Sequence, residues 1–297
     1  MKPRIALTVG DPAGIGPEIC AKALVDPRVL DVCEPVLYMP PGPQRFEPGV
    51  LSAEAGLASY EVLLRAVQDA QAGVVDAVAT APVNKEAFRL AGLPWAGHTD
   101  LLAHLTGAPR VAMMFHSDVL RVVLATVHIA LADVPAALTR ETMAETIRLV
   151  ARELPRFGIA RPRIGVAGLN PHAGEHGLFG REEIDAIGPA IEESRAEGID
   201  VTGPFPGDTI FVRATRGAVD VVIACYHDQG LIPVKLLAFG QAVNVTIGLP
   251  IIRTSVDHGT AYDIAGKGVA EHGSLLEAVK VAARLAQSWS PVHQPSR

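Results

Sequence analysis

Apolar and polar residues are arranged along the chain in two distinct patterns. Short runs of Val, Ile, Ala and Leu predict buried strands, at residues 4–9, 77–80, 111–115, 121–125, 163–168, 219–224 and 243–247. Longer stretches with apolar residues at helical spacing predict helices, at residues 17–25, 55–72, 139–157, 181–197 and 275–287. Near-continuous apolar strands between amphipathic helices are typical of a sheet covered on both faces. The pattern therefore predicts an α/β fold with a parallel or mixed sheet.

Two segments interrupt this pattern. Residues 39–49 are rich in Pro and Gly and predict a loop, and the polar tail after Ser288 predicts a frayed end. Thr139, followed by Thr142 and Glu145, offers an N-terminal cap for the helix at 139–157. No repeat, low-complexity tract or clean linker marks a domain boundary, so any domains are expected to be discontinuous.

Composition narrows the class of protein. Hydrophobic residues make up 49% of the 297 residues and charged residues 20%, which is enough for a large core and excludes a disordered chain. The net charge is −6 and the basic residues are scattered. This argues against nucleic-acid binding, because that function needs a basic stripe to meet phosphates. Any anionic ligand must instead be bound by a local group of cations.

The cysteine pattern and the lack of long apolar runs predict the cellular compartment of the protein. The cysteines are odd in number and lack Cys-x-x-Cys spacing, which indicates buried thiols in a reducing compartment. They are Cys20, Cys33 and Cys225. No signal-peptide profile precedes the first predicted strand, and no run of about 18 apolar residues is free of charge or histidine. We therefore expect a cytoplasmic protein with no membrane partner.

Histidines follow several of the predicted strands. Of the 10 histidines, some lie in Gly-rich or polar segments after apolar runs: His98, His128, His172, His227 and His258. Among these, His128, His172 and His227 each come shortly after a predicted strand. Ligands of α/β folds gather at the carboxyl ends of strands, and converging imidazoles with open positions suit a divalent metal. The alternative is that each ring bonds to the backbone at its strand end.

Lys235, Asn244 and Arg253 are spaced nine residues apart, each in or beside an apolar segment. Charged residues are rarely buried unless they are paired. Two cations and an amide could bind a phosphate and a carboxylate. The alternative is an ordinary surface lysine and an arginine paired in a salt bridge.

Three further segments combine small and polar residues. In Gly97-His98-Thr99-Asp100 the imidazole and the hydroxyl could bind a substrate, or Thr99 could cap a helix. Residues 10–18 follow the first strand and begin a helix. This segment could bind an anion at the helix N-terminus, or it could form a tight structural turn. It does not fit the dinucleotide-binding pattern Gly-x-Gly-x-x-Gly. Residues 257–268 have the composition of a loop that wraps a polar ligand.

Taken together, these motifs resemble the 4-hydroxythreonine-4-phosphate dehydrogenase family of pyridoxal phosphate biosynthesis, over nearly the whole chain. The resemblance is carried by Gly-Asp-Pro-Ala-Gly-Ile-Gly-Pro-Glu, Thr-Ala-Pro-Val-Asn-Lys, Gly-His-Thr-Asp, Leu-Asn-Pro-His-Ala-Gly-Glu, Tyr-His-Asp-Gln-Gly and Ile-Arg-Thr-Ser-Val-Asp-His-Gly-Thr-Ala. The segment Asp-Ile-Ala-Gly-Lys-Gly also resembles the cofactor loop of isocitrate and isopropylmalate dehydrogenases. That likeness implies a shared fold.

The resemblance implies two α/β/α domains with a cleft between them, as in isocitrate and isopropylmalate dehydrogenases. The first would comprise residues 1–130 with 258–297, and the second residues 131–257 with the dimer interface. The resemblance further implies a homodimer whose active site is shared between the subunits. It implies NAD or NADP as cofactor and a divalent metal, which is zinc, magnesium or cobalt.

The resemblance also implies roles for individual residues. His128, His172 and His227 match the metal ligands of the family. The positions that match its substrate contacts are His98, Thr99, Lys235, Asn244 and Arg253. No catalytic residue can be assigned from the sequence, because Asp228 and Lys85 are both candidates for the general base and Asp228 could equally orient a histidine.

The implied reaction is oxidation of 4-phosphooxy-L-threonine (4-hydroxythreonine 4-phosphate) with decarboxylation to 3-amino-1-hydroxyacetone phosphate. Paralogues that oxidise erythronate or threonate 4-phosphate, or a cis-dihydrodiol carboxylic acid, share the histidines. The residues that favour a phosphorylated substrate are Lys235, Asn244 and Arg253.

This chain departs from the family pattern at two places. The stretch around Pro40–Pro48 is shorter, and Asp100 replaces the more usual Glu. An interpretation of another class is a non-catalytic small-molecule-binding or metal-storage protein on the same fold. The retained histidines and anion contacts argue against it.

Overall fold

The computed structural model describes residues 1–43, 46–95 and 97–288, so the predicted frayed tail lies outside the described residues. The chain forms two compact units, one built from residues 1–109 with the residues from 249 onward and the other from residues 110–248. These boundaries differ from the domain boundaries that the resemblance implies, which are 130/131 and 257/258. The difference arises because the strands within 110–130 pair with strands of the second unit, and the strand at Arg253–Ser255 pairs with one of the first.

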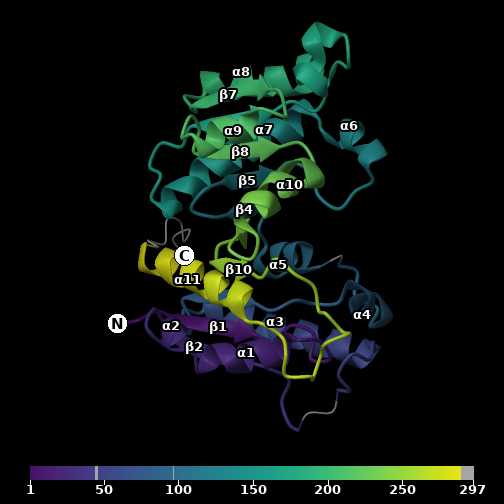
Figure 1. Ribbon diagram of the computed structural model, residues 1–297, viewed down its shortest axis with the longest axis vertical. Helices are drawn as coiled ribbons and strands as arrows, with labels where there is room; N and C mark the ends of the chain where they lie inside the picture. Colours follow the sequence, from purple (N-terminus) through teal and green to yellow (C-terminus); the bar gives the residue numbers. More distant parts are fainter. Residues whose placement is uncertain (44–45, 96, 289–297) are drawn as a thin grey trace. The chain divides into compact units, whose positions relative to one another are not determined.

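The first unit contains a parallel sheet with the order β2-β1-β3-β10 (Figure 1). Its strands are β1 (Arg4–Thr8), β2 (Glu34–Tyr38), β3 (Ala77–Thr80) and β10 (Arg253–Ser255). Its helices are α1 (Gly16–Leu24), α2 (Pro27–Leu30), α3 (Ala53–Gln71), α4 (Lys85–Leu90), α5 (His98–Thr106) and α11 (Gly273–Ser288). Helices α1, α2 and α11 contact one another, whereas α3 contacts α4 and α5, and both groups pack on the sheet.

The second unit contains a mixed sheet with the order β9-β4-β5-β8-β6-β7. Its strands are β4 (Ala112–His116), β5 (Arg121–Leu124), β6 (Ile164–Ala167), β7 (Val201–Phe205), β8 (Val221–Ala224) and β9 (Val243–Ile247). Strand β4 runs antiparallel to β5 and β9, and the pairs from β5 to β7 are parallel. Its α-helices are α6 (Val134–Ala137), α7 (Arg140–Glu153), α8 (Gly188–Ala196), α9 (Ile210–Thr215) and α10 (His227–Ala238).

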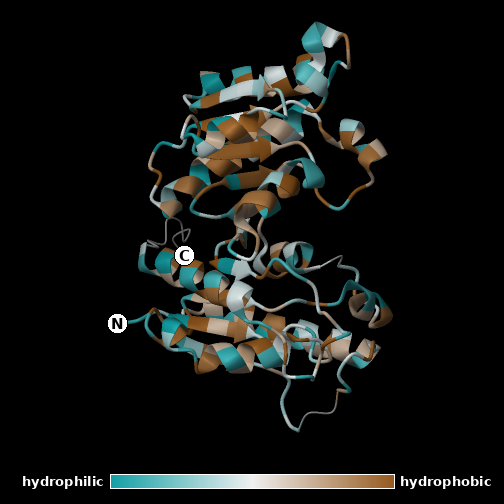
Figure 2. Ribbon diagram, in the orientation of Figure 1, coloured by the Kyte–Doolittle hydropathy of each residue, from teal (hydrophilic) through white to brown (hydrophobic). Residues whose placement is uncertain are grey.

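Three 3-10 helices and one π-helix complete the described part of the second unit. They are η1 (Leu131–Asp133), η2 (Leu154–Phe157), η3 (Pro171–Gly177) and the π-helical η4 (Glu183–Ile187), which leads into α8. The central strands β5 and β8 are apolar, whereas the outward side of α8 is largely polar (Figure 2). The core of this unit therefore lies along the central strands, as the apolar runs predict.

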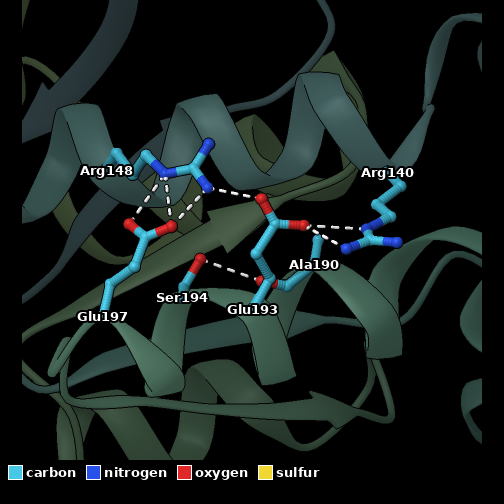
Figure 3. A network of polar contacts seen from close by, with 6 residues as sticks. All are labelled: Arg140, Arg148, Ala190, Glu193, Ser194 and Glu197. Carbon is cyan, nitrogen blue, oxygen red and sulfur yellow. Dashed lines mark hydrogen bonds and ion pairs between the residues drawn. The ribbon is translucent and has the colours of Figure 1, made fainter.

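Helices α7 and α8 are joined by a network of ion pairs (Figure 3). Arg148 pairs with Glu193 and Glu197, and Arg140 pairs with Glu193. The two arginines lower the pKa of Glu193, and Arg148 lowers that of Glu197. The predicted cap of α7 is confirmed, because the Thr139 hydroxyl accepts the N–H of Thr142.

Each predicted strand corresponds to a strand of the structure, and the expected α/β architecture is confirmed. Strands β2, β7 and β10 were not predicted, and neither were the helices α2, α4, α6, α9 and α10. In the part of the chain that the structure describes, no helix has the length and apolar character that a membrane crossing requires.

Candidate active site

The three candidate metal ligands follow three adjacent strands of the second unit (Figure 1). Strand β8 lies between β5 and β6 and is parallel to both, so their carboxyl ends meet at one edge. His128 follows β5, His172 follows β6, and His227 follows β8 as the first residue of α10. The fold therefore delivers all three histidine segments to the edge where ligands of α/β proteins bind.

Side-chain hydrogen bonds tie these strand ends together. The Gln229 side chain accepts the N–H of Cys225 at 2.7 Å and donates to the carbonyl of Gly168 at 2.7 Å. The Thr126 hydroxyl donates to the carbonyl of Cys225 at 2.7 Å. The start of α10 is thus attached to the ends of β5 and β6.

His128 and His227 lie close to one another. Their ring centroids are 5.7 Å apart. Imidazoles that share one ion, with metal–nitrogen distances of about 2.1 Å, have centroids roughly 5–6 Å apart, so this pair fits a divalent metal. The Nδ1 atom of His227 is 2.6 Å from Asp228 Oδ1, which leaves Nε2 as the atom able to hold an ion. The two rings line a hollow of about 280 Å³ with Thr126, Tyr226 and their neighbours.

His172 lies on a different part of the same edge. It is exposed, its ring centroid is 6.3 Å from that of Phe179, and it lines a larger hollow of about 860 Å³. Asp228 lines both hollows. Among residues 1–43, 46–95 and 97–288, no three His, Cys, Asp or Glu side chains are grouped to hold a metal. The described part of one chain therefore brings His128 and His227 together without His172.

The segment that carries His172 has an unusual backbone. Five consecutive residues, 172–176, have positive φ angles between 40° and 80°. The buried carboxylate of Glu183 accepts the N–H of Asn170 at 2.8 Å and its side-chain amide at 3.0 Å. A Cβ atom on Gly174 would lie only 2.7 Å from Glu183 Oε2. Strained left-handed residues persist where surrounding contacts hold them, and Glu183 supplies those contacts.

In the first unit, Arg253 and His98 form a candidate anion site. Arg253 is 1% exposed, and burial lowers the pKa of its guanidinium to about 9, so it remains a cation at neutral pH. Burial, and then the charge of Arg253, hold the pKa of His98 well below its usual value. The buried Nε2 atom of His98 has no hydrogen-bond partner among the described residues. A neutral imidazole whose Nε2 atom has no protein partner, next to a buried cation, is suited to binding an anionic ligand.

The remaining candidates divide between the units. Thr99 is the second residue of α5, and the N-cap is Gly97, so Thr99 is not the helix cap. Asn244 lies on β9, and its buried Oδ1 atom has no partner in the described chain. Lys235 is exposed near the end of α10. Of the two candidate bases, Lys85 is the first residue of α4. Its side chain lies near Gly97, because a Cβ atom added to that glycine would be 3.7 Å from Lys85 Cε.

The glycine-rich turn after β1 is occupied by protein rather than open to a ligand. A Cβ on Gly16 would lie 1.7 Å from the carbonyl oxygen of Val9, and one on Gly14 would lie 2.9 Å from that of Thr260. The hydroxyl of Tyr262 donates to buried Asp11 at 2.5 Å, and burial raises the pKa of that carboxyl. Of the two interpretations of this turn, the structure favours the structural one.

Helix α1 holds the loop at 257–268 and the residues that follow it directly. Glu18 accepts the N–H groups of Gly268 and Ala270 at 3.1 and 2.8 Å. Lys22 donates to both of their carbonyls, at 3.0 and 2.6 Å. This loop is thus fixed by side chains of α1.

Comparison with known proteins identifies the family. The model of the family described as "Pyridoxal phosphate biosynthetic protein PdxA" matches residues 19–282. The chain belongs to the PdxA family. The resemblance drawn from the sequence motifs is therefore confirmed, and the chain is an oxidoreductase that acts on a hydroxyl group.

Relatives with two different names are equally similar to this PdxA-family chain. It is 45% identical to a 4-hydroxythreonine-4-phosphate dehydrogenase of Desulforapulum autotrophicum, covering 95% of each chain. It is also 45% identical to a D-threonate 4-phosphate dehydrogenase of Cupriavidus necator, covering 96% of this chain and 97% of the other.

Solved structures agree with the fold of this PdxA-family chain. The 4-hydroxythreonine-4-phosphate dehydrogenase of Klebsiella pneumoniae matches with a TM-score of 0.88 and 42% identity over 97% of this chain and 99% of that one. Isocitrate dehydrogenase of Methylococcus capsulatus matches with a TM-score of 0.50 and 18% identity over 95% of this chain and 84% of that one, which concerns the fold alone. The expected likeness to isocitrate dehydrogenase is therefore confirmed.

Proposed function

We propose that this protein is an NAD(P)- and divalent-metal-dependent dehydrogenase of 4-hydroxythreonine 4-phosphate. The products are 3-amino-1-hydroxyacetone phosphate, carbon dioxide and the reduced cofactor, and the pathway served is pyridoxine biosynthesis. The observation that carries the proposal is the buried cation Arg253 beside a neutral His98 whose Nε2 atom is open. Such a pair is suited to the phosphate end of a small substrate.

The second unit supports the metal part of the proposal. His128 and His227 would hold the ion through their ring nitrogens, with Asp228 fixing the tautomer of His227. His172 is the proposed third ligand, and zinc, magnesium and cobalt are the candidate ions. When bound, the ion would supply Lewis-acid chemistry and the nicotinamide would accept the hydride.

The bonds that change follow from the substrate. The reacting hydroxyl is β to the carboxylate, so loss of its proton and of the hydride on the same carbon gives a β-keto acid. The bond to the carboxylate then breaks, and the electron pair left on the α-carbon takes up a proton. Asp228, beside His227, and Lys85, beside Gly97, are the proposed carriers of these protons.

We assign the remaining polar contacts to the substrate. The residues proposed to bind it are His98, Thr99, Lys235, Asn244 and Arg253. The Asn244 amide supports this role because its buried Oδ1 atom has no partner among the described residues, and a substrate ammonium or hydroxyl would satisfy it. The loop at 257–268 is proposed to bind NAD or NADP, and its attachment to Glu18 and Lys22 supports a fixed binding surface.

We further propose that the protein acts as a homodimer with a shared active site. Helix α10 begins at His227, and side chains on it and just after it are apolar yet exposed: Ile232 by 66%, Leu236 by 82% and Phe239 by 78%. Burying such a surface against a second copy would be favourable. A partner would also bring its own histidines to the same edge, which agrees with the separation of His172 from His128 and His227 within the described part of one chain.

A second candidate function is oxidation of D-threonate 4-phosphate. It is favoured by the equal 45% identity to relatives of both names. This substrate differs at the α-carbon and keeps the phosphate, so the proposed anion site serves either compound. Oxidation of a cis-dihydrodiol carboxylic acid is less favoured, because both relatives are named for 4-phosphate substrates.

Replacement of Arg253 by alanine tests the phosphate assignment. Charge-assisted hydrogen bonds to a buried ligand are worth about 1.5–3 kcal/mol, so we expect KM for the phosphorylated substrate to rise roughly 10- to 100-fold. The change for the dephosphorylated analogue should be much smaller. Steady-state kinetics with both compounds measures this difference, and an equal effect on the two would reject the assignment.

A further inference from the structure

Thr80 is a buried polar residue that the proposed function does not use. It is the last residue of β3 and is 0% exposed. On the neighbouring strand β10, Ser255 pairs with Thr80 and Arg253 pairs with Val78. Alternate residues of a strand share a face, as do paired residues of parallel strands. The Arg253 side chain can therefore run along β3 as far as Thr80.

The hydrogen bonds around the Thr80 hydroxyl have a fixed direction. Arg253 Nη2 donates to Thr80 Oγ1 at 2.8 Å. A guanidinium has only donors, so the hydroxyl must accept there and direct its own hydrogen elsewhere. Its nearer acceptor is Ser255 Oγ at 2.9 Å, and the carbonyl of Thr254 lies at 3.4 Å. Ser255 in turn donates to the carbonyl of Thr80 at 3.3 Å. The hydroxyl thus presents a lone pair to one edge of the guanidinium.

We propose that Thr80 is a positioning residue that sets the orientation of the Arg253 guanidinium in the anion site beside His98. The inference rests on the proposed function, in which Arg253 binds the phosphate. It goes further by naming the side chain that fixes the geometry of that contact. A guanidinium recognises a phosphate through a planar pair of donors, so its rotation decides whether both reach the ligand.

The consequence of losing the hydroxyl follows from burial. Valine has nearly the shape of threonine, so Thr80→Val removes the acceptor without opening a large space. The Nη2 hydrogen that pointed to Thr80 then lies against a methyl group, and leaving a buried donor unsatisfied is costly. The guanidinium is expected to rotate away from its position toward another acceptor. The effect falls on phosphate binding rather than on the chemical step.

The test is the kinetics of the full-length Thr80→Val protein, with inorganic phosphate as a competitive inhibitor. We expect KM for the phosphorylated substrate and the inhibition constant of phosphate to rise together, each about 10-fold, with kcat changed less than about threefold. Thr80→Ser keeps the hydroxyl and should return both constants to the wild-type values. An unchanged inhibition constant in Thr80→Val would overturn the inference.

Thr254→Val is the matched control. Thr254 is also 0% exposed and lies next to Arg253, but its hydroxyl donates to the carbonyl of Ala278 in α11. The Thr254→Val variant also loses a buried hydrogen bond of a threonine hydroxyl. If Thr80→Val acted only by destabilising the fold, the phosphate inhibition constant would therefore rise in both variants. An equal rise of the phosphate inhibition constant in Thr254→Val and Thr80→Val would contradict the positioning role.

Two further variants keep the inference testable and separate from the proposed function. If Thr80→Val does not fold, Ser255→Ala removes the nearer acceptor of the Thr80 hydrogen and should raise the phosphate inhibition constant in the same direction. In an Arg253→Ala background, Thr80→Val should add no further change, because the group it orients is gone. If Arg253→Ala does not alter phosphate binding, the proposed function fails. If Arg253→Ala alters it and Thr80→Val does not, only the present inference fails.

Discussion

Alanine in place of His227 is expected to abolish binding of the divalent ion and to lower kcat/KM by roughly 10³-fold or more. The physical reason is that His227 and His128 are the candidate ligands whose ring centroids lie 5.7 Å apart within one chain. The His227 side chain is 41% exposed and contacts the exposed Asp228, so its removal leaves the core intact. Metal content after dialysis, cofactor reduction and the melting temperature measure the three parts of this prediction.

His176→Asn is the control for this variant. His176 is exposed and has a φ of 56°, a conformation that Asn tolerates, and it is not among the proposed ligands. Metal content and turnover should stay near the wild-type values. Full activity of His227→Ala in metal-free buffer, with unchanged metal content, would reject the metal role of the histidine pair.

The shared site predicts complementation between inactive variants. His172→Asn and His227→Ala should each be inactive alone. If His172 and His227 of one site come from different subunits, a mixed dimer has one intact site. Random exchange of subunits then restores about a quarter of the wild-type activity. If mass spectrometry confirms the exchange and no activity returns, each subunit must supply a complete ligand set.

Alanine in place of Gly16 is expected to lower the free energy of unfolding by about 3 kcal/mol or more. A Cβ at this position would lie 1.7 Å from the carbonyl oxygen of Val9 and 3.3 Å from the Cβ of Ala81. Both neighbours are buried residues at the end of the parallel sheet, so the helix α1 must shift as a whole. For a domain of this size the melting temperature should fall by roughly 6–12 °C, which calorimetry measures directly.

Gly273→Ala is the matched control, because Gly273 likewise opens a helix and a Cβ added to it would meet nothing within 4 Å. Its effect should stay within about 0.5 kcal/mol, since only the conformational freedom of the unfolded chain changes. Equal melting temperatures for Gly16→Ala and wild type would show that the turn after β1 is not close-packed.

The strands that the sequence predicts are those with continuous apolar runs. Strand β10 was missed because it has three residues and begins with a buried arginine, which a search for apolar runs passes over. Strand β7 contains Gly203-Pro204, a typical signal for a turn. Helix α10 was missed because Pro233 lies inside it and exposed Ile232 and Leu236 blur its apolar face. These are positions where tertiary contacts outweigh local pattern.

The positions of the candidate ligands in the fold were predicted, although their roles stay predictions. The placement of His128, His172 and His227 after strands followed from the pattern, because apolar runs ending in a histidine are visible in the sequence. The roles of Thr80 and Glu183 were not, since both depend on hydrogen bonds to residues distant in the chain or in another element. Thr80 begins the motif Thr-Ala-Pro-Val-Asn-Lys, which marked the segment but not its contact with Arg253.

The central claim, a metal-dependent oxidation of a phosphorylated hydroxy acid, is tested most directly by one assay of cofactor reduction. The protein is supplied with NAD or NADP and with 4-hydroxythreonine 4-phosphate, D-threonate 4-phosphate or a cis-dihydrodiol carboxylic acid, before and after removal of divalent ions. The account predicts reduction with 4-hydroxythreonine 4-phosphate, accompanied by release of carbon dioxide, that is lost on chelation and restored by zinc, magnesium or cobalt. Turnover that persists after chelation, or reduction only with the unphosphorylated acid, would contradict it.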